Sequence, residues 1–154
     1  MGNDMQKSKP ADNNQDVGYM ITNVSYGIRQ YFDRLFVNYD ITYPQSRVLT
    51  RLFAQLDKAD VNQRDLEYAL GIKASSVSSL VRNLEQKGFV RCERMAEDTR
   101  NKRVLLTEKG IELKGVVEEA RVKAEQLVVQ GIPENDREVF RACLVKVLEN
   151  LSEV

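Results

Sequence analysis

Hydrophobic residues recur with a helical period from Val17 to Tyr39, where successive apolar positions lie one, three or four residues apart. This spacing places the apolar side chains on one face of an α-helix. The face is broad and rich in aromatic residues, more than the neighbours within one small domain usually cover. We therefore predict a long first helix in residues 17–41, with part of its apolar face left to contact a second copy of the chain.

Two capping patterns mark the starts of the next helices. Thr42, with Gln45 three positions later, forms a capping box before a further helical run of apolar residues. Asn62 is a favourable N-cap, and Asp65 at the third helical position suits the positive end of the helix dipole. Gly71 then ends this short helix, because glycine readily adopts the left-handed conformation found at helix C-termini.

Another helix follows Gly71 after a brief turn, and much of its surface is small and polar. Its apolar face consists of Val77, Leu80, Val81 and Leu84. The rest of its surface carries Ser75, Ser76, Ser78, Ser79, Arg82 and Asn83. Serine is only a moderate helix former, so four serines in one short helix indicate a role at the surface. Two helices joined by a glycine-containing turn are typical of a helix-turn-helix.

Two short apolar runs follow, and both have the composition of β-strands. These runs, FVRCER and RVLLT, are separated by the polar segment MAEDTRNK. They predict a β-hairpin whose charged tip carries Asp98 and Arg100. A helix-turn-helix followed directly by such a hairpin is a winged helix. The fold class that we predict is therefore mainly α (α+β), a winged helix-turn-helix flanked by long terminal helices.

The C-terminal part of the chain predicts two more helices. Thr107 can cap the first, which continues to Gly131, and Pro133 separates it from the second. Cys143 lies on the apolar face of the last helix, where we expect it in the core. The predicted organisation is a disordered leader, an N-terminal dimerisation helix, a winged-helix lobe and C-terminal dimerisation helices, in residues 1–16, 17–41, 42–107 and 108–154.

Composition excludes several classes of protein. The chain of 154 residues contains no histidine and two cysteines, so the commonest general base and metal ligand is missing. We find no catalytic or metal-binding residues, expect no cofactor, and predict that the protein is not an enzyme. No apolar stretch is long enough to span a membrane and the first residues are not a secretory signal, so we expect a cytoplasmic protein.

The formal net charge is zero, but the charges are unevenly distributed. Residues 73–103 carry eight basic and four acidic side chains, a net of +4, whereas residues 1–72 carry −1 and residues 104–154 carry −3. A polyanion responds to such a local patch rather than to the total charge. The central region is therefore the part of the chain that we expect to meet nucleic acid.

The two parts of the predicted winged helix suit duplex DNA in different ways. A helix with a small outer face fits the major groove, and a cationic hairpin can reach the backbone or a narrow minor groove. The residues that we predict to contact DNA are Ser75, Ser76, Ser78, Ser79, Arg82, Asn83, Arg94, Asp98, Arg100 and Lys102. The alternative is a winged helix that docks a protein partner without binding DNA. Such a module would need an exposed apolar patch on the second helix of the helix-turn-helix.

The region from Thr42 to Gly110 resembles the MarR family of bacterial transcriptional regulators. The resemblance rests on LGIKASSVSSLVRNLEQKGFV, on the pattern Asp98-x-Arg100 and on LTEKG, which follow one another at family-like spacing. It implies a homodimer on a palindromic operator, with Arg100 at the minor groove and Asp98 orienting it. The family often has arginine where this chain has Cys92. We interpret the chain as a repressor that a small-molecule effector releases from DNA.

Candidates for sensing a signal are few. The aromatic residues that we expect either in the core or around a pocket for a small aromatic or lipophilic effector are Phe36, Tyr39, Tyr43 and Phe53. Cys92 lies near Arg91 and Arg94 in the sequence, and these cations would lower its thiol pKa if it were exposed. Redox sensing through Cys92 is therefore a second hypothesis, whereas the absence of histidine disfavours metal sensing.

Overall fold

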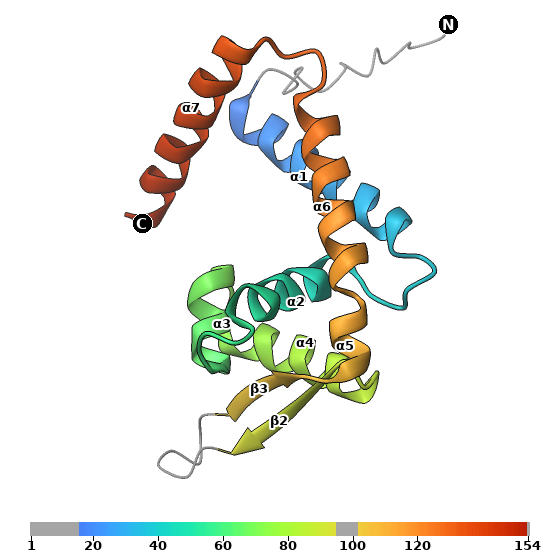
Figure 1. The fold of residues 1–154 in the computed structure, drawn as a ribbon. Helices are drawn as coiled ribbons and strands as arrows, with labels where there is room; N and C mark the ends of the chain where they lie inside the picture. The colour runs from blue at the N-terminus through green and yellow to red at the C-terminus, as the bar shows by residue number, and fades with distance from the viewer. Residues whose placement is uncertain (1–15, 95–101, 154) are drawn as a thin grey trace, which may run out of the picture.

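The computed structural model describes residues 16–94 and 102–153. Within these ranges one lobe holds α2 to α5 and a small sheet, and a second is formed by α1, α6 and α7 (Figure 1). This arrangement confirms the predicted fold class. The elements are α1 Val17–Leu35, α2 Tyr43–Gln55, β1 Val61–Asn62, α3 Gln63–Leu70, α4 Ala74–Gln86, β2 Val90–Arg94, β3 Lys102–Leu106, α5 Glu108–Glu112, α6 Lys114–Val129 and α7 Glu134–Ser152.

Helix α1 ends at Leu35, several residues before the end that the apolar spacing predicts. Residues 36–40 form turns instead, and Asp40 adopts a φ of 54°, in the left-handed region that interrupts a regular helix. The chain turns back here because the Asp33 carboxylate accepts a hydrogen bond of 2.9 Å from the backbone N–H of Tyr43. This bond holds the start of α2 against α1.

The capping box predicted at Thr42 is present, and the predicted N-cap Asn62 forms a second one with Asp65. The Thr42 backbone N–H donates to Gln45 Oε1 at 3.0 Å, and the Thr42 hydroxyl accepts from the Gln45 N–H at 3.5 Å. Asn62 and Asp65 exchange the same two bonds, each of 2.9 Å. Gly71 ends α3 with a φ of 63°, as predicted. The boxes determine where α2 and α3 begin, because they satisfy N–H groups that have no partner inside the helix.

The sheet has three antiparallel strands in the order β1-β3-β2, one more than the predicted hairpin. Strands β2 and β3 pair along their whole length, with Arg94 opposite Lys102, which confirms the two predicted strands. The extra strand β1 places Val61 opposite Val104, and both side chains are buried. Strand β1 has only two residues, and one of them, Asn62, also caps α3. The sequence therefore contains no alternation of apolar and polar residues that would predict this strand.

The main hydrophobic core lies between α2, α3, α4 and the sheet. Its most deeply buried residues, each less than 2% exposed, are Phe36, Leu49, Leu66, Leu84, Val48, Val77, Val81, Val90 and Val104. Val117, Ala120 and Ala124 on α6 extend the core toward α1. Helix α7 buries none of its described residues. None of the described helices is both long and apolar enough to cross a lipid bilayer.

The single helix predicted after Thr107 is divided at Leu113 into α5 and α6. The Leu113 N–H bonds to the Gly110 carbonyl three residues back, at 3.2 Å, so the last turn of α5 is tighter than an α-helix. Gly110 also packs directly against the backbone of Phe89 at the end of the α4–β2 connection. The short helix α5 is therefore fixed to the winged-helix lobe, and α6 begins directly after it.

Candidate nucleic-acid interface

The outer face of α4 presents small polar side chains and one long basic side chain to solvent. Val77, Val81 and Leu84 are buried and hold the opposite face of the helix against the core. The predicted contact residues that lie exposed on α4 are Ser75, Ser76, Ser79, Arg82 and Asn83. The surface that α4 offers to a partner is therefore hydrophilic, with a single cation near its centre.

Ser78 does not share this exposed face. It is half-buried, and its hydroxyl donates to Gln63 Oε1 of α3 at 3.4 Å. The bond joins the two helices of the helix-turn-helix. Ser78 therefore helps to pack α4 against α3, and its contact with DNA stays a prediction. Sequence spacing could not separate it from its neighbours, because four serines occupy five consecutive positions.

Two of the predicted wing cations lie side by side at the base of the hairpin. Arg94 and Lys102 are opposite each other on β2 and β3, and both are exposed. The other basic residues of these strands form ion pairs with acidic neighbours: Arg103 with Asp60 and Arg91 with Glu93. Asp98 and Arg100 lie outside the described residues, and their roles remain predictions.

Cys92 connects the wing strand to α4 through its backbone N–H, which donates to Glu85 Oε1 at 2.9 Å. Burial raises the pKa of the Cys92 thiol, the Glu85 carboxylate raises it further, and Lys102 offsets only part of this effect. The hypothesis of a lowered pKa required an exposed thiol, and this condition is not met. The thiol is half-buried, and Arg91 pairs with Glu93 instead.

We expect Cys92 to react slowly with thiol reagents. In a Cys143→Ser variant, alkylation at mildly alkaline pH should be slower than for free cysteine, because a raised pKa leaves less thiolate at any given pH. Glu85→Gln should speed the reaction, since it removes a negative charge and keeps an oxygen that can accept the Cys92 N–H. Thiolate absorbance measured across a range of pH gives the pKa of Cys92. A pKa below that of free cysteine would contradict this expectation.

Cys143 is exposed on α7, so the prediction that it lies in the core of the chain is wrong. Its exposure follows from the position of α7, which stands away from α1 and α6 (Figure 1). Large apolar side chains on the same helix are also exposed: Phe140 by 43%, Leu148 by 67% and Leu151 by 69%. A single chain therefore leaves an uncovered apolar surface along α7.

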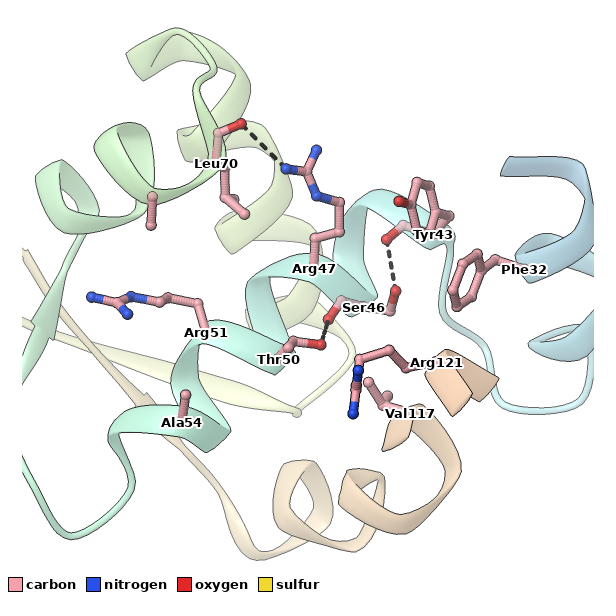
Figure 2. Close-up of a pocket in the computed structure, with 11 residues that line it drawn as sticks. Phe32, Tyr43, Ser46, Arg47, Thr50, Arg51, Ala54, Leu70, Val117 and Arg121 are labelled. Atoms are coloured by element: carbon pink, nitrogen blue, oxygen red, sulfur yellow. Dashed lines mark hydrogen bonds between the residues drawn. The ribbon is translucent and has the colours of Figure 1, made fainter. Parts of the chain in front are cut away.

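A cleft of about 420 Å³ opens beside α2, where the two lobes meet (Figure 2). Phe32 of α1 stacks on Tyr43 at one end, with ring centroids 4.5 Å apart. Val117 and Arg121 of α6 line another side. The remaining wall comes from α2 and the end of α3, and includes Ser46, Arg47, Thr50, Arg51, Ala54 and Leu70.

Three guanidinium groups lie along this cleft. Arg47 donates to the Leu70 carbonyl through a long bond of 3.4 Å, and Arg121 pairs with Glu118 at 2.6 Å. Arg51 Nε is buried and has no hydrogen-bond partner within the described residues. Nowhere in residues 16–94 and 102–153 do three or more cysteine, aspartate or glutamate side chains form a group that could bind a metal ion. The cleft thus combines apolar walls with hydrogen-bond donors.

The four aromatic residues predicted for an effector pocket are not brought together. Only Tyr43 lines the cleft. Phe36 is almost completely buried in the core, and Phe53 packs against the core from α2. Tyr39 lies on the turn after α1 and is 42% exposed. Phe32, which the prediction omitted, stacks on Tyr43 and lines the cleft.

The arrangement of these parts defines a class of protein. A helix-turn-helix followed by a β-ribbon, set between long terminal helices, is a winged helix of the MarR type. Over residues 30–116, more than half of its 154 residues, the chain matches the family described as Transcriptional regulator SarA/Rot. The chain belongs to this family of transcriptional regulators, which confirms the resemblance seen in the sequence.

Individual relatives agree with this assignment. The HTH-type transcriptional regulator MgrA of Staphylococcus aureus is 34% identical over 82 residues, which are 53% of this chain and 54% of that protein. The chain thus spans about half the length of the curated relatives it matches. MepR of S. aureus, solved as a DNA complex, has 32% identity and a TM-score of 0.80 over 87% of this chain and 97% of its own. MarR is 19% identical, with a TM-score of 0.72 over 90% of this chain and 99% of its own, and it shares the fold.

Proposed function

We propose that the protein is a dimeric, sequence-specific regulator that binds double-stranded DNA and represses transcription until a small effector releases it. The observation that carries this proposal is the exposed polar face of α4, with Ser75, Ser76, Ser79 and Arg82, close to the wing. The relatives are bacterial regulators, so we place the protein in the bacterial cytoplasm, acting by binding rather than by catalysis.

The side chains of α4 suit the major groove. Small serine side chains let the helix backbone come close to the base edges, and their hydroxyls can donate or accept hydrogen bonds. Arg82 is long enough to reach a guanine or a phosphate. MepR, which is 32% identical to this chain, is solved as a complex with DNA, and this supports DNA as the partner. Apart from Ala74, the exposed positions of α4 are polar, which disfavours the alternative of a module that docks an apolar protein surface.

The wing would contact the DNA beside the groove that α4 occupies. Arg94 and Lys102 lie opposite each other at its base, and both of these cations are exposed. Lys and Arg side chains bind phosphates and release counterions, which adds affinity without sequence preference. Arg100, oriented by Asp98, would extend the same surface into the minor groove, where negative potential is greatest in narrow segments.

A second copy of the chain would cover the apolar side chains of the terminal helices. On α1, Val17, Met20 and Val24 are each more than half exposed, and α7 buries nothing in a single chain. Contiguous apolar surface of this kind marks an interaction site, and a two-fold dimer covers it with the same surface from its partner. Two winged helices related by this symmetry would read a palindromic operator.

The cleft beside α2 is our candidate site for the effector. Its apolar walls include Phe32, Tyr43 and Val117, and Arg51 provides a buried Nε without a partner in the described structure. A small aromatic or lipophilic molecule with an anionic group fits this combination. Because α1 and α6 on one side and α2 on the other line the cleft, a ligand there would favour some placements of the DNA-binding lobe over others.

Arg82→Ala tests the role of α4 most simply. We expect specific binding to the preferred duplex to weaken by roughly 1–3 kcal/mol, the usual value of one good base contact, and non-specific binding to weaken less. Arg29→Ala is the matched control, since it removes one exposed arginine from α1. Fluorescence anisotropy with a labelled duplex gives both affinities. Equal affinities and unchanged sequence preference for Arg82→Ala would show that α4 does not read the DNA.

A further inference from the structure

The turn that ends α4 is tied to a distant part of the chain by one side chain. Lys87 follows the last residue of α4, and its ammonium group lies 2.7 Å from the Asp40 carbonyl and 3.2 Å from Asp40 Oδ1. It also lies 3.2 Å from Gln45 Oε1. An ammonium group has three donors, and three acceptors surround this one. The Lys87 side chain is 26% exposed, whereas most lysine side chains extend into solvent.

The acceptors lie at the end of the turn after α1 and in the first turn of α2. Asp40 holds a left-handed conformation at the end of the turn that follows α1. Gln45 is 4% exposed, and the oxygen that faces Lys87 also accepts the Thr42 N–H in the capping box of α2. The end of α4 is therefore attached where α1 gives way to α2.

The same turn is also held from the side of α5. Lys109 Nζ donates to the Lys87 carbonyl at 2.7 Å, and the Thr107 hydroxyl donates to the Gly88 carbonyl at 2.6 Å. Figure 1 shows α5 beside this end of α4, where it leads into α6. Bonds from the α1–α2 turn, from α2 and from α5 thus meet at Lys87 and Gly88.

We infer that Lys87 is a positioning residue that fixes the direction of α4 relative to α1. Its effect on DNA rests on the proposed function. Two half-sites lie a fixed distance apart, so two α4 helices can bind them together only if each is held at one angle to the dimer helices. Without the Lys87 ammonium group, α4 would keep its core contacts through Val77, Val81 and Leu84 but lose its polar bonds to the α1–α2 turn.

The test measures a distance within one chain. Spin labels are placed at Arg29→Cys on α1 and Ser79→Cys on α4, both exposed positions, in the full chain with Cys92→Ser and Cys143→Ser. Labelled protein is diluted with unlabelled protein so that only pairs within one chain contribute. Pulsed electron paramagnetic resonance should give a narrow distribution of distances for this protein. After Lys87→Met, which keeps most of the length of the side chain and removes its charge, the distribution should be broader or shifted.

Lys58→Met is the control, because it removes one exposed lysine for which no side-chain bond appears in the described structure. Asp40→Asn is a second test, since it removes the carboxylate and keeps the backbone acceptor and a residue tolerant of the left-handed conformation. It should broaden the distribution less than Lys87→Met. If Lys87→Met folds and its distance distribution is unchanged, the inference is overturned. If Lys87→Met does not fold, an unchanged distance distribution in Asp40→Asn overturns it.

DNA affinity separates this inference from the proposed function. On the duplex selected from a random pool, Lys87→Met should weaken specific binding about tenfold, as when the competent fraction of molecules falls to about a tenth. Binding to a scrambled duplex should change no more than in Lys58→Met. If the distribution broadens but neither variant nor parent binds any duplex, the proposed function fails and the positioning role of Lys87 stands.

Discussion

Replacing Leu148 and Leu151 together by glutamate should separate the protein into monomers and abolish tight binding to a palindromic duplex. In a single chain, Leu148 is 67% exposed and Leu151 is 69% exposed. In the proposed dimer they are covered, and four buried carboxylates without partners would oppose association. Loss of the second DNA-binding lobe should lower affinity by about 10²–10⁴-fold, because linked sites bind with a high effective concentration.

Ala142→Glu with Asn150→Glu is the matched control. It adds the same charge to the same helix, at exposed positions outside the stripe that contains Leu148 and Leu151. We expect this variant to remain a dimer. Sedimentation velocity at micromolar concentration measures the outcome for both proteins. A glutamate variant at Leu148 and Leu151 that stays a dimer of unchanged stability would show that α7 does not form the interface.

Gly110→Ala should be among the most destabilising single substitutions in the chain. A Cβ at Gly110 would lie 2.0 Å from the Phe89 carbonyl oxygen and 3.0 Å from its carbonyl carbon. Both are backbone atoms, and that oxygen already accepts the Thr107 N–H at 3.1 Å. The clash can be relieved only by moving α5 away from the wing. We expect the free energy of unfolding to fall by about 3 kcal/mol or more, at the upper end of the cost of overpacking.

Gly115→Ala provides the comparison. Gly115 lies in the first turn of α6, and beyond its chain neighbours and the nearby backbone of its own helix, no described atom lies within 4 Å of the position that its Cβ would take. Alanine is favoured over glycine in a helix by roughly 0.5–1 kcal/mol, so this variant should be as stable as the parent or slightly more so. Urea denaturation followed by circular dichroism measures both. Equal midpoints for the two variants would contradict the packing of α5 against Phe89.

The predictable parts of the fold are those that depend on neighbouring residues. The capping boxes at Thr42 and Asn62 and the glycine turn at Gly71 are encoded within four or five positions, and all three are present. The parts that were missed depend on distant partners. Strand β1 exists because Val61 meets Val104, and α1 ends early because Asp33 bonds to the first residue of α2.

The candidate sites show the same division. The exposed serines and Arg82 of α4 could be predicted, because the apolar stripe of the helix fixes which face is outward. Ser78 could not, since its burial depends on Gln63 of the preceding helix. The cleft is lined by arginines of α2 and α6 that only the folded chain brings together. One signal was available: Arg47 and Arg51 lie four residues apart, on the same side of α2.

The proposal that a symmetric dimer reads DNA through α4 is tested most directly by selection from a pool of random duplexes, followed by sequencing of the bound fraction. We predict enrichment of a palindrome whose half-sites are separated by about one helical turn, about 10–10.5 base pairs from centre to centre. The Arg82→Ala protein should lose preference at particular positions in each half-site. Failure of the parent protein to enrich any sequence, or enrichment of a sequence without two-fold symmetry, would contradict the proposal.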